Sequence, residues 1–265
     1  MTDELRWKGV VAYDGTDWYG WQRQPYGNTI QNCLEERLSL LLKRRIDIHG
    51  SGRTDAGVHA LAQVFHFSAD WKHGAEPFLK ALNAGLPESI LVRSIEPVPA
   101  KFHARYSACG KRYTYSIHQG IALPTEVRTT WVLDQRHQPL DYDAMRAAAD
   151  LFVGTHDFSA FSANRRKYGQ KNGIKTLHLV AIEPEGSQVK LLYEGEGFLY
   201  KMARTLTGAL VQVGLGRLTS QEILELLRGK QRSYLTPSAP ARGLTLEEVF
   251  YQWPEHWRVA TRGKN

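Results

Sequence analysis

The sequence contains few cysteines, and their positions argue against two classes of small scaffold. Only Cys33 and Cys109 occur among the 265 residues, and no Cys-x-x-Cys pair or Cys/His zinc spacing is present. This pattern disfavours both a disulfide framework and a zinc site as the basis of the fold. It is typical of a reducing compartment, so we expect a cytoplasmic protein.

Long hydrophobic runs are also missing. No segment approaches the length of apolar residues that is needed to span a bilayer. The first six residues lack the charged-then-apolar order of a signal peptide. We therefore expect no membrane partner.

The glycine-rich segment 50–59 does not match the common phosphate-binding loops. A P-loop requires Lys-Ser/Thr after its second glycine, but Gly57 is followed by Val58 and His59. A dinucleotide fingerprint requires a glycine where Asp55 stands, and a carboxylate there would repel a pyrophosphate. The Gly-x-Ser-x-Gly motif of many serine hydrolases is missing from the chain as well.

What segment 50–59 does contain is a single carboxylate, Asp55, two residues after Arg53. Glycines let the backbone turn sharply and let a ligand approach closely, so an acid on such a turn is a candidate reactive group. Asp and Gly are also common in ordinary turns, and spacing alone leaves that alternative open. We interpret His59, His66 and His103 as polar or packing residues, because no second ligand or nucleophile stands at useful spacing.

The charge of the chain indicates a polyanionic partner. The formal net charge is +7, and the segments 101–112 and 164–175 carry several Lys and Arg residues but no acid. Aromatic residues are interleaved with these cations, which suits binding to a phosphate backbone with unstacked bases. Either segment alone could be a solvated loop, but two of them favour nucleic acid.

Hydrophobic periodicity predicts two α+β halves that share an antiparallel sheet. In the first half we expect strands over 10–13, 46–51, 62–68 and 90–98, with helices from Asn28 to about 42 and over 77–84. In the second half we expect strands over 106–118, 176–185, 190–195 and 245–251, with helices over 141–152, 198–213 and 221–228.

Two further candidates lie on these expected elements. Arg204 lies beside the apolar stripe of helix 198–213, where a buried cation would need a partner. A surface arginine with a buried stem fits the same pattern. Tyr113 and Tyr115 alternate onto one face of their strand, so Tyr113 can either pack in the core or stack on a base.

Taken in chain order, these motifs resemble the tRNA pseudouridine synthase A family along nearly the whole chain. The most specific match is Gly-Arg-Thr-Asp-Ala-Gly-Val-His at 52–59. The other matching segments are 13–16, 20–22, 82–87, 102–105, 111–115, 154–158, 197–204 and 239–244.

The resemblance implies an isomerase that converts uridine to pseudouridine at positions 38, 39 and 40 of the tRNA anticodon stem-loop. By the match, Asp55 is the catalytic carboxylate, Arg204 pairs with it, and Tyr113 stacks on the target base. Arg53 helps to extrude the nucleotide. The implied tRNA-binding residues are Arg53, Arg105, Lys111 and Tyr113.

The resemblance also implies an α+β fold of two RRM-like subdomains that share a mixed, mainly antiparallel sheet around a central basic cleft. We expect subdomain 1–104 to carry the catalytic aspartate and subdomain 105–265 to complete the site. The implied enzyme is a homodimer without metal or organic cofactor. The chain departs from the family pattern near Ser162, in the basic loop 164–175 and at Lys175, which concerns tRNA contacts rather than the chemistry.

Two other functions compete with this one. A non-catalytic RNA-binding protein with RRM-like halves would carry the paired aromatics of an RRM sheet, for which no consensus is evident, and it leaves Asp55 unexplained. A metal-dependent nuclease needs clustered carboxylates, but residues 50–70 offer only Asp55 and Asp70. For the isomerase, the sequence leaves open whether Asp55 attacks covalently or removes the C2′ proton, and whether a tyrosine or a water accepts the proton from C5.

Overall fold

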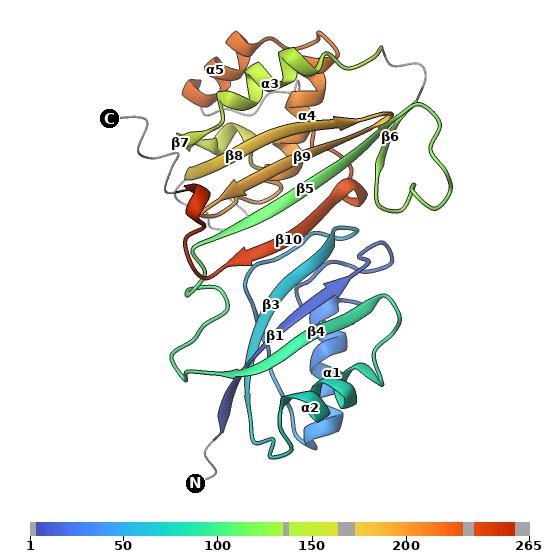
Figure 1. The fold of residues 1–265 in the computed structure, drawn as a ribbon, viewed down its shortest axis with the longest axis vertical. Coiled ribbons are helices and arrows are strands. Elements are labelled where there is room, and N and C mark those ends of the chain that lie inside the picture. Colours follow the sequence, from blue (N-terminus) through green and yellow to red (C-terminus); the bar gives the residue numbers. More distant parts are fainter. Residues whose placement is uncertain (1–3, 135–137, 164–172, 230–235, 258–265) are drawn as a thin grey trace. The chain divides into compact units, whose positions relative to one another are not determined.

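The computed structural model describes residues 4–134, 138–163, 173–229 and 236–257. The chain divides into two compact units, one of residues 1–109 with 245–252 and one of residues 110–244 with 253–265. Each unit combines helices with a mainly antiparallel sheet (Figure 1), which confirms the predicted α+β class. The division into domains 1–104 and 105–265 stays a prediction.

The first unit has the order β-α-β-β-α-β, followed by a strand from the far end of the chain. Its elements are β1 (Leu5–Tyr13), α1 (Ile30–Leu42), β2 (His49–Gly50), β3 (His59–Ala69), α2 (Ala75–Asn83), β4 (Ile90–Val98) and β10 (Leu244–Phe250). β1 is central and antiparallel to both β3 and β4, and β2 pairs with β3. The spatial order β4-β1-β3-β2 is that of ferredoxin-like and RRM-like folds.

β3 also pairs with a second strand along the same edge as β2. β2 is antiparallel to β3 near His66, whereas β10 is parallel to β3 near His59. The two short pairings occupy different ends of β3. The strand predicted over 245–251 is therefore confirmed, and it belongs to the sheet of the first unit.

The core of the first unit lies between its sheet and its two helices. Trp7 of β1 is buried and meets Phe78 of α2 edge to face, with ring centroids 5.2 Å apart. Gly9 allows Phe65 to cross β1, since a Cβ there would lie 2.3 Å from the Phe65 ring. Each large apolar side chain buried in this way stabilises the unit by about 1.5–3 kcal/mol.

The second unit contains a sheet in the order β5-β9-β8-β7, with β6 parallel to β5. Its strands are β5 (Gly110–Gln119), β6 (Trp131–Leu133), β7 (Gly154–Asp157), β8 (Ile174–Glu185) and β9 (Gln188–Gly195). Its helices are α3 (Tyr142–Asp150), α4 (Met202–Gly214) and α5 (Ser220–Gly229), with short 3₁₀ turns at Phe158–Phe161 and Ala241–Gly243. Most α4 side chains are buried, and α3 packs on both α4 and α5.

Two predicted elements of the first unit were wrong at their ends. Asn28 has a φ of +53°, and α1 is capped instead by Thr29, whose side chain accepts from the Asn32 amide. The strand predicted over 46–51 shrinks to His49–Gly50. The amides of Ile46 and Ile48 bond to the side chains of Ser39 and Glu35 of α1, so they do not enter a strand ladder.

The second unit shows similar corrections. The helix predicted from residue 198 begins at Met202, because Lys201 is left-handed with a φ of +58°. The strand predicted from residue 106 begins at Gly110, after a turn in which Ser107 bonds back to His103. The short strands β6 and β7 were missed. Residues 164–172 of the basic loop lie outside the described residues.

Candidate functional site

Asp55 lies in the loop between β2 and β3. Backbone hydrogen bonds to the segment that contains Trp18 and Trp21 hold this loop in place. The Trp21 amide donates to the Thr54 carbonyl at 3.1 Å, and the Gly57 amide donates to the Trp18 carbonyl at 3.3 Å. Val58 closes a turn on the Asp55 carbonyl at 3.1 Å. The carboxylate is therefore carried at a half-exposed position on a braced loop.

Two glycines outside the motif let other segments press against this loop. Gly20 has a φ of +82°, and a Cβ there would lie 2.6 Å from the Thr54 carbonyl oxygen. A Cβ on Gly15 would lie 2.0 Å from the Val58 carbonyl oxygen. These close approaches explain why glycine stands at both positions.

Side chains from the core anchor the residues beside Asp55. The Tyr13 hydroxyl and Thr54 Oγ1 are 2.8 Å apart and both residues are buried. Burial raises the pKa of Tyr13 well above its usual value, so its hydroxyl stays neutral. Gln63 donates to the Gly52 carbonyl at 3.0 Å. The loop is thus tied to β1 and to β3.

His59 takes part in the same bracing. It is buried at the start of β3, and its Nδ1 accepts from the Gly15 amide at 3.1 Å. Asp14 Oδ1 lies 3.2 Å from the same nitrogen. This agrees with the interpretation of His59 as a packing and polar residue.

Arg53 is exposed and is oriented by a neighbouring amide. Its Nε donates to Gln22 Oε1 at 2.9 Å, and Gln22 in turn donates to Gln31 of α1 at 2.9 Å. In the sequence, Gln22 is marked by its place in the matching segment 20–22, which does not indicate this contact. Gln22 therefore holds the Arg53 guanidinium in a defined orientation.

In the second unit, Tyr113 is buried on β5. Its ring meets Phe198 edge to face, with centroids 4.9 Å apart and planes at 77°. Tyr193 of β9 stands opposite it, and the Tyr193 hydroxyl bonds to Thr207 at 2.7 Å. Lys111 lies two residues earlier on β5 and is half-buried.

Arg204 is half-buried on α4 and bonds to a chain segment that precedes β10. Its Nε donates to the Ala239 carbonyl at 2.7 Å, and the Ala239 amide donates to the Arg204 carbonyl at 2.9 Å. Arg204 therefore links α4 to the segment around Ala239 through two hydrogen bonds. Its predicted pairing with Asp55 stays a prediction.

The six candidate residues fall into two sets. Asp55, Arg53 and Arg105 belong to the first unit, whereas Lys111, Tyr113 and Arg204 belong to the second. Arg53 and Asp55 share one loop. Arg105 lies after β4, with its guanidinium 5.8 Å from the centre of the Tyr106 ring.

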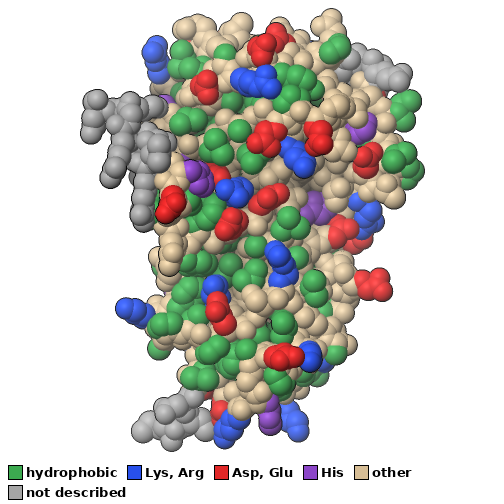
Figure 2. Space-filling model, in the orientation of Figure 1, with side chains coloured by type: hydrophobic (Ala, Val, Ile, Leu, Met, Phe, Trp, Pro, Cys, Tyr) green, Lys and Arg blue, Asp and Glu red, His purple; other side chains and the backbone are tan. Residues whose placement is uncertain are grey.

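The charge distribution is mixed on the face shown in Figure 2, where Lys and Arg side chains lie among Asp and Glu side chains. In the basic segment 101–112, Lys101 and Arg105 are exposed, but Arg112 is paired with Glu194 at 2.6 Å. Among the described residues, no cluster of His, Cys, Asp or Glu is arranged to hold a metal ion, and no helix is long and apolar enough to span a membrane.

Comparisons with known proteins agree with one another. The family model described as tRNA pseudouridine synthase matches residues 10–107 and 148–252. A tRNA pseudouridine synthase A from Acetivibrio thermocellus is 38% identical over 244 residues, covering 92% of this chain and 98% of that protein. One from Chlamydia muridarum is 40% identical over 250 residues, covering 93% of this chain and 92% of that protein.

Among solved structures, a chain of a Cbf5-Nop10-Gar1 complex aligns with 77% of this chain and 45% of its own length. The identity is 12% and the TM-score is 0.35.

Proposed function

Because this chain belongs to the tRNA pseudouridine synthase family, and is therefore an isomerase, we propose that it forms pseudouridine at positions 38, 39 and 40 of the tRNA anticodon stem-loop. The observation that carries the proposal is the Asp55 loop. A half-exposed carboxylate stands on a turn that hydrogen bonds and two close glycine contacts hold in place. Preorganised reactive groups of this kind are what catalysis requires.

The chemistry moves one base without changing its atoms. The N1–C1′ bond of uridine breaks, the uracil rotates, and C5 bonds to C1′ while the C5 proton leaves and N1 gains one. An ionised Asp55 can start this reaction in two ways. It can attack covalently, or it can remove the C2′ proton to give a glycal.

The target uridine has to leave its stack before Asp55 can reach it. Base flipping costs a few kcal/mol. In the proposed mechanism, Arg53, oriented by Gln22, occupies the space that the extruded nucleotide leaves. Tyr113 stacks on the uracil, and Arg204 pairs with Asp55 and orients it.

The remaining parts of the proposal concern the setting of the enzyme. We propose that Lys111 and Arg105 contact the tRNA, that two chains form a homodimer, and that the enzyme works in the cytoplasm without metal or organic cofactor. The family resemblance supports the homodimer. The free cysteines Cys33 and Cys109 support a reducing compartment such as the cytoplasm.

Tritium release from tRNA labelled at C5 of uridine tests the proposal directly. The wild type should release tritium from a tRNA transcript that carries uridine at positions 38, 39 and 40, and Asp55→Ala should bind the tRNA but release none. Replacing the three uridines singly by cytidine should remove the matching share of the signal. A wild type that binds tRNA without release would instead support the non-catalytic RNA-binding alternative.

A further inference from the structure

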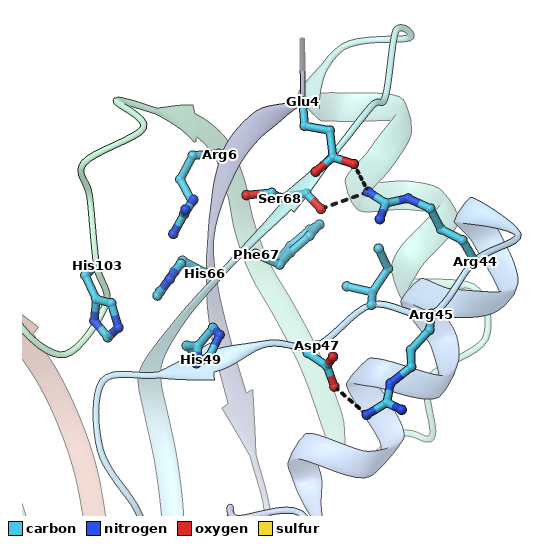
Figure 3. A pocket seen from close by; sticks show the side chains of 11 residues that line it. Glu4, Arg6, Arg44, Arg45, Asp47, His49, His66, Phe67, Ser68 and His103 are labelled. Carbon is cyan, nitrogen blue, oxygen red and sulfur yellow. Dashed lines mark hydrogen bonds and ion pairs between the residues drawn. The ribbon is translucent and has the colours of Figure 1, made fainter. Parts of the chain in front are cut away.

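The first unit contains a second candidate site, a pocket of about 400 Å³ near the end of β3 (Figure 3). Its lining includes three arginines and three histidines: Arg6, Arg44, Arg45, His49, His66 and His103. Figure 3 shows Arg6 and the histidines together on one side, with the other two arginines opposite them. The imidazole rings of His66 and His103 are 4.5 Å apart.

Two histidines of this pocket, His66 and His103, are arranged as donors rather than as metal ligands. His66 Nδ1 accepts from the Ala104 amide at 3.0 Å, and His103 Nδ1 accepts from the Arg105 amide at 3.1 Å. A neutral imidazole that accepts through one nitrogen carries its proton on the other. His66 is buried, whereas His103 is half-buried, so His103 is the ring with its N–H available to a ligand. The pocket therefore suits a ligand that accepts hydrogen bonds.

Arg6 is the cation that lacks a complete set of partners. Its Nη1 donates to the Phe102 carbonyl at a long 3.4 Å, and its buried Nε has no partner among the described residues. In contrast, the other two arginines form ion pairs. Arg44 Nη2 lies 2.8 Å from Glu4 Oε1, and Arg45 Nη2 lies 3.1 Å from Asp47 Oδ1. An anion beside Arg6 would supply the acceptor that its guanidinium lacks.

The electrostatics of the pocket favour the same ligand. The pKa of His66 is lowered to about 4, mainly by burial and then by the electrostatic effects of His103, Arg6 and His49. Burial is also the main cause that lowers the pKa of His103, and the electrostatic effects of His49, Arg6 and Arg105 lower it as well. The cluster thus repels additional protons, and a bound anion would relieve this repulsion.

An exposed aromatic ring lies beside the donors. Tyr106 is 78% exposed, and its ring centroid is 4.3 Å from that of His103. Exposed aromatic rings beside cations are platforms on which the bases of single-stranded nucleic acid stack. The seven residue-to-residue steps from His59 to His66 along β3 span about 24 Å, so one free nucleotide could not touch both this pocket and the Asp55 loop.

We propose that this pocket binds a backbone phosphate of the RNA substrate through Arg6 and His103, while a neighbouring base stacks on Tyr106. The inference rests on the proposed function, because it gives the tRNA-modifying enzyme a second contact with its RNA away from Asp55. The contact acts on affinity for tRNA, and its loss should raise KM more than it lowers kcat.

Affinity for a tRNA transcript, measured with the full chain by fluorescence anisotropy at several salt concentrations, tests this site. Arg6→Gln should weaken binding roughly tenfold and make the slope of log K against log[salt] shallower by about 0.7–0.9. Arg6→Lys should restore part of the loss. The matched control is Lys80→Gln, which removes one charge from an exposed, Glu76-paired position of the same unit outside the pocket.

The exposed position of Tyr106 provides a variant whose fold is not at risk. Tyr106→Ala should weaken tRNA binding at least about fivefold, from the loss of one stacked base. If Arg6→Gln and Tyr106→Ala both bind tRNA as tightly as Lys80→Gln, the proposal is wrong. Its failure would leave tritium release by the wild type untouched. Conversely, a wild type without tritium release whose tRNA binding still depends on Arg6 would remove the proposed function and keep this site.

Inorganic phosphate distinguishes the backbone of RNA from a small free anion. The histidine signals of the wild type, followed by NMR at fixed pH, should shift with phosphate and shift again with tRNA. Phosphate shifts that vanish in Arg6→Gln, combined with unchanged tRNA affinity, would assign the pocket to a free anion and overturn the RNA assignment.

Discussion

Replacing Glu194 by glutamine should destabilise the second unit strongly. Glu194 is 1% exposed on β9, next to the partner of Tyr113. Arg112 donates to its Oε1 through Nε at 2.7 Å and Nη2 at 2.6 Å, while His256 bonds to Oε2 at 2.6 Å and Trp257 Nε1 donates to the same oxygen. This one carboxylate therefore joins β5 to the segment that follows β10.

The size of the loss in stability follows from the number of hydrogen bonds that the Glu194 carboxylate accepts. A glutamine has one acceptor oxygen, so its NH₂ group would face either the Arg112 donors or the His256 and Trp257 donors. Removing one partner of a buried ion pair costs about 3–5 kcal/mol. Because the side chain of Arg112 is 30% exposed and that of His256 is 53% exposed, solvent offsets part of the loss, and we expect about 3 kcal/mol.

Calorimetry of the full chain measures this directly. A loss of about 3 kcal/mol corresponds to a fall in Tm of roughly 6–12 °C for a unit of this size. Glu185→Gln, at an exposed position of the β8–β9 hairpin, is the control and should stay within about 1 °C of the wild type. Equal Tm values for Glu194→Gln and Glu185→Gln would refute the claim that the carboxylate holds these segments together.

The same carboxylate predicts how stability depends on pH. Burial raises the pKa of Glu194, but the hydrogen bonds from His256, Trp257 and Arg112 outweigh burial and hold the pKa below its usual 4.5. The folded state therefore binds this proton less readily than the unfolded state. Its contribution to stability is present above the unfolded pKa and is lost as the pH falls through the folded pKa. Glu194→Gln should flatten the wild-type decline in Tm over that acidic range.

Three further substitutions test the bracing of the first unit. Gly20→Ala places a Cβ 2.6 Å from the Thr54 carbonyl at a φ of +82°, so tritium release should fall at least about tenfold while far-UV circular dichroism is retained. Tyr13→Phe leaves Thr54 Oγ1 without its 2.8 Å partner and should lower the free energy of unfolding in urea by about 1 kcal/mol. Thr29→Ala removes the α1 cap and should cost about 1 kcal/mol in the same assay, and an unchanged midpoint would contradict either assignment.

Local patterns predicted the elements whose hydrogen bonds are made within or between adjacent segments. The strand over 90–98 and the hairpin around Gly186 agree with the structure, because alternating side chains and a turn residue are properties of short sequence. The segment 46–51 reads equally well as a strand. The amides of Ile46 and Ile48 instead bond to Ser39 and Glu35 of α1, a contact that no local pattern shows.

The candidate site divides in the same way. Asp55 and Arg53 could be found from the sequence, because a short motif carries a carboxylate, a cation and the glycines of a turn together. What braces them could not, since Tyr13 and Thr54 are 41 positions apart and Gln22 is 31 positions from Arg53. The sequence did not indicate a structural role for Glu194, because no local pattern distinguishes it from other acidic residues on strands.

The amino-acid sequence by itself determined the family and the class of fold and indicated Asp55 as the candidate carboxylate, because short motifs and periodicities along the chain carry this information. Tertiary structure alone decided which polar groups meet. The pocket of Figure 3 collects Arg6, His49, His66 and His103 from β1, β2, β3 and the segment after β4. Each looks like a routine surface or core residue in isolation, and only the pairing of β1 and β2 with β3 brings their charges and donors into one cavity.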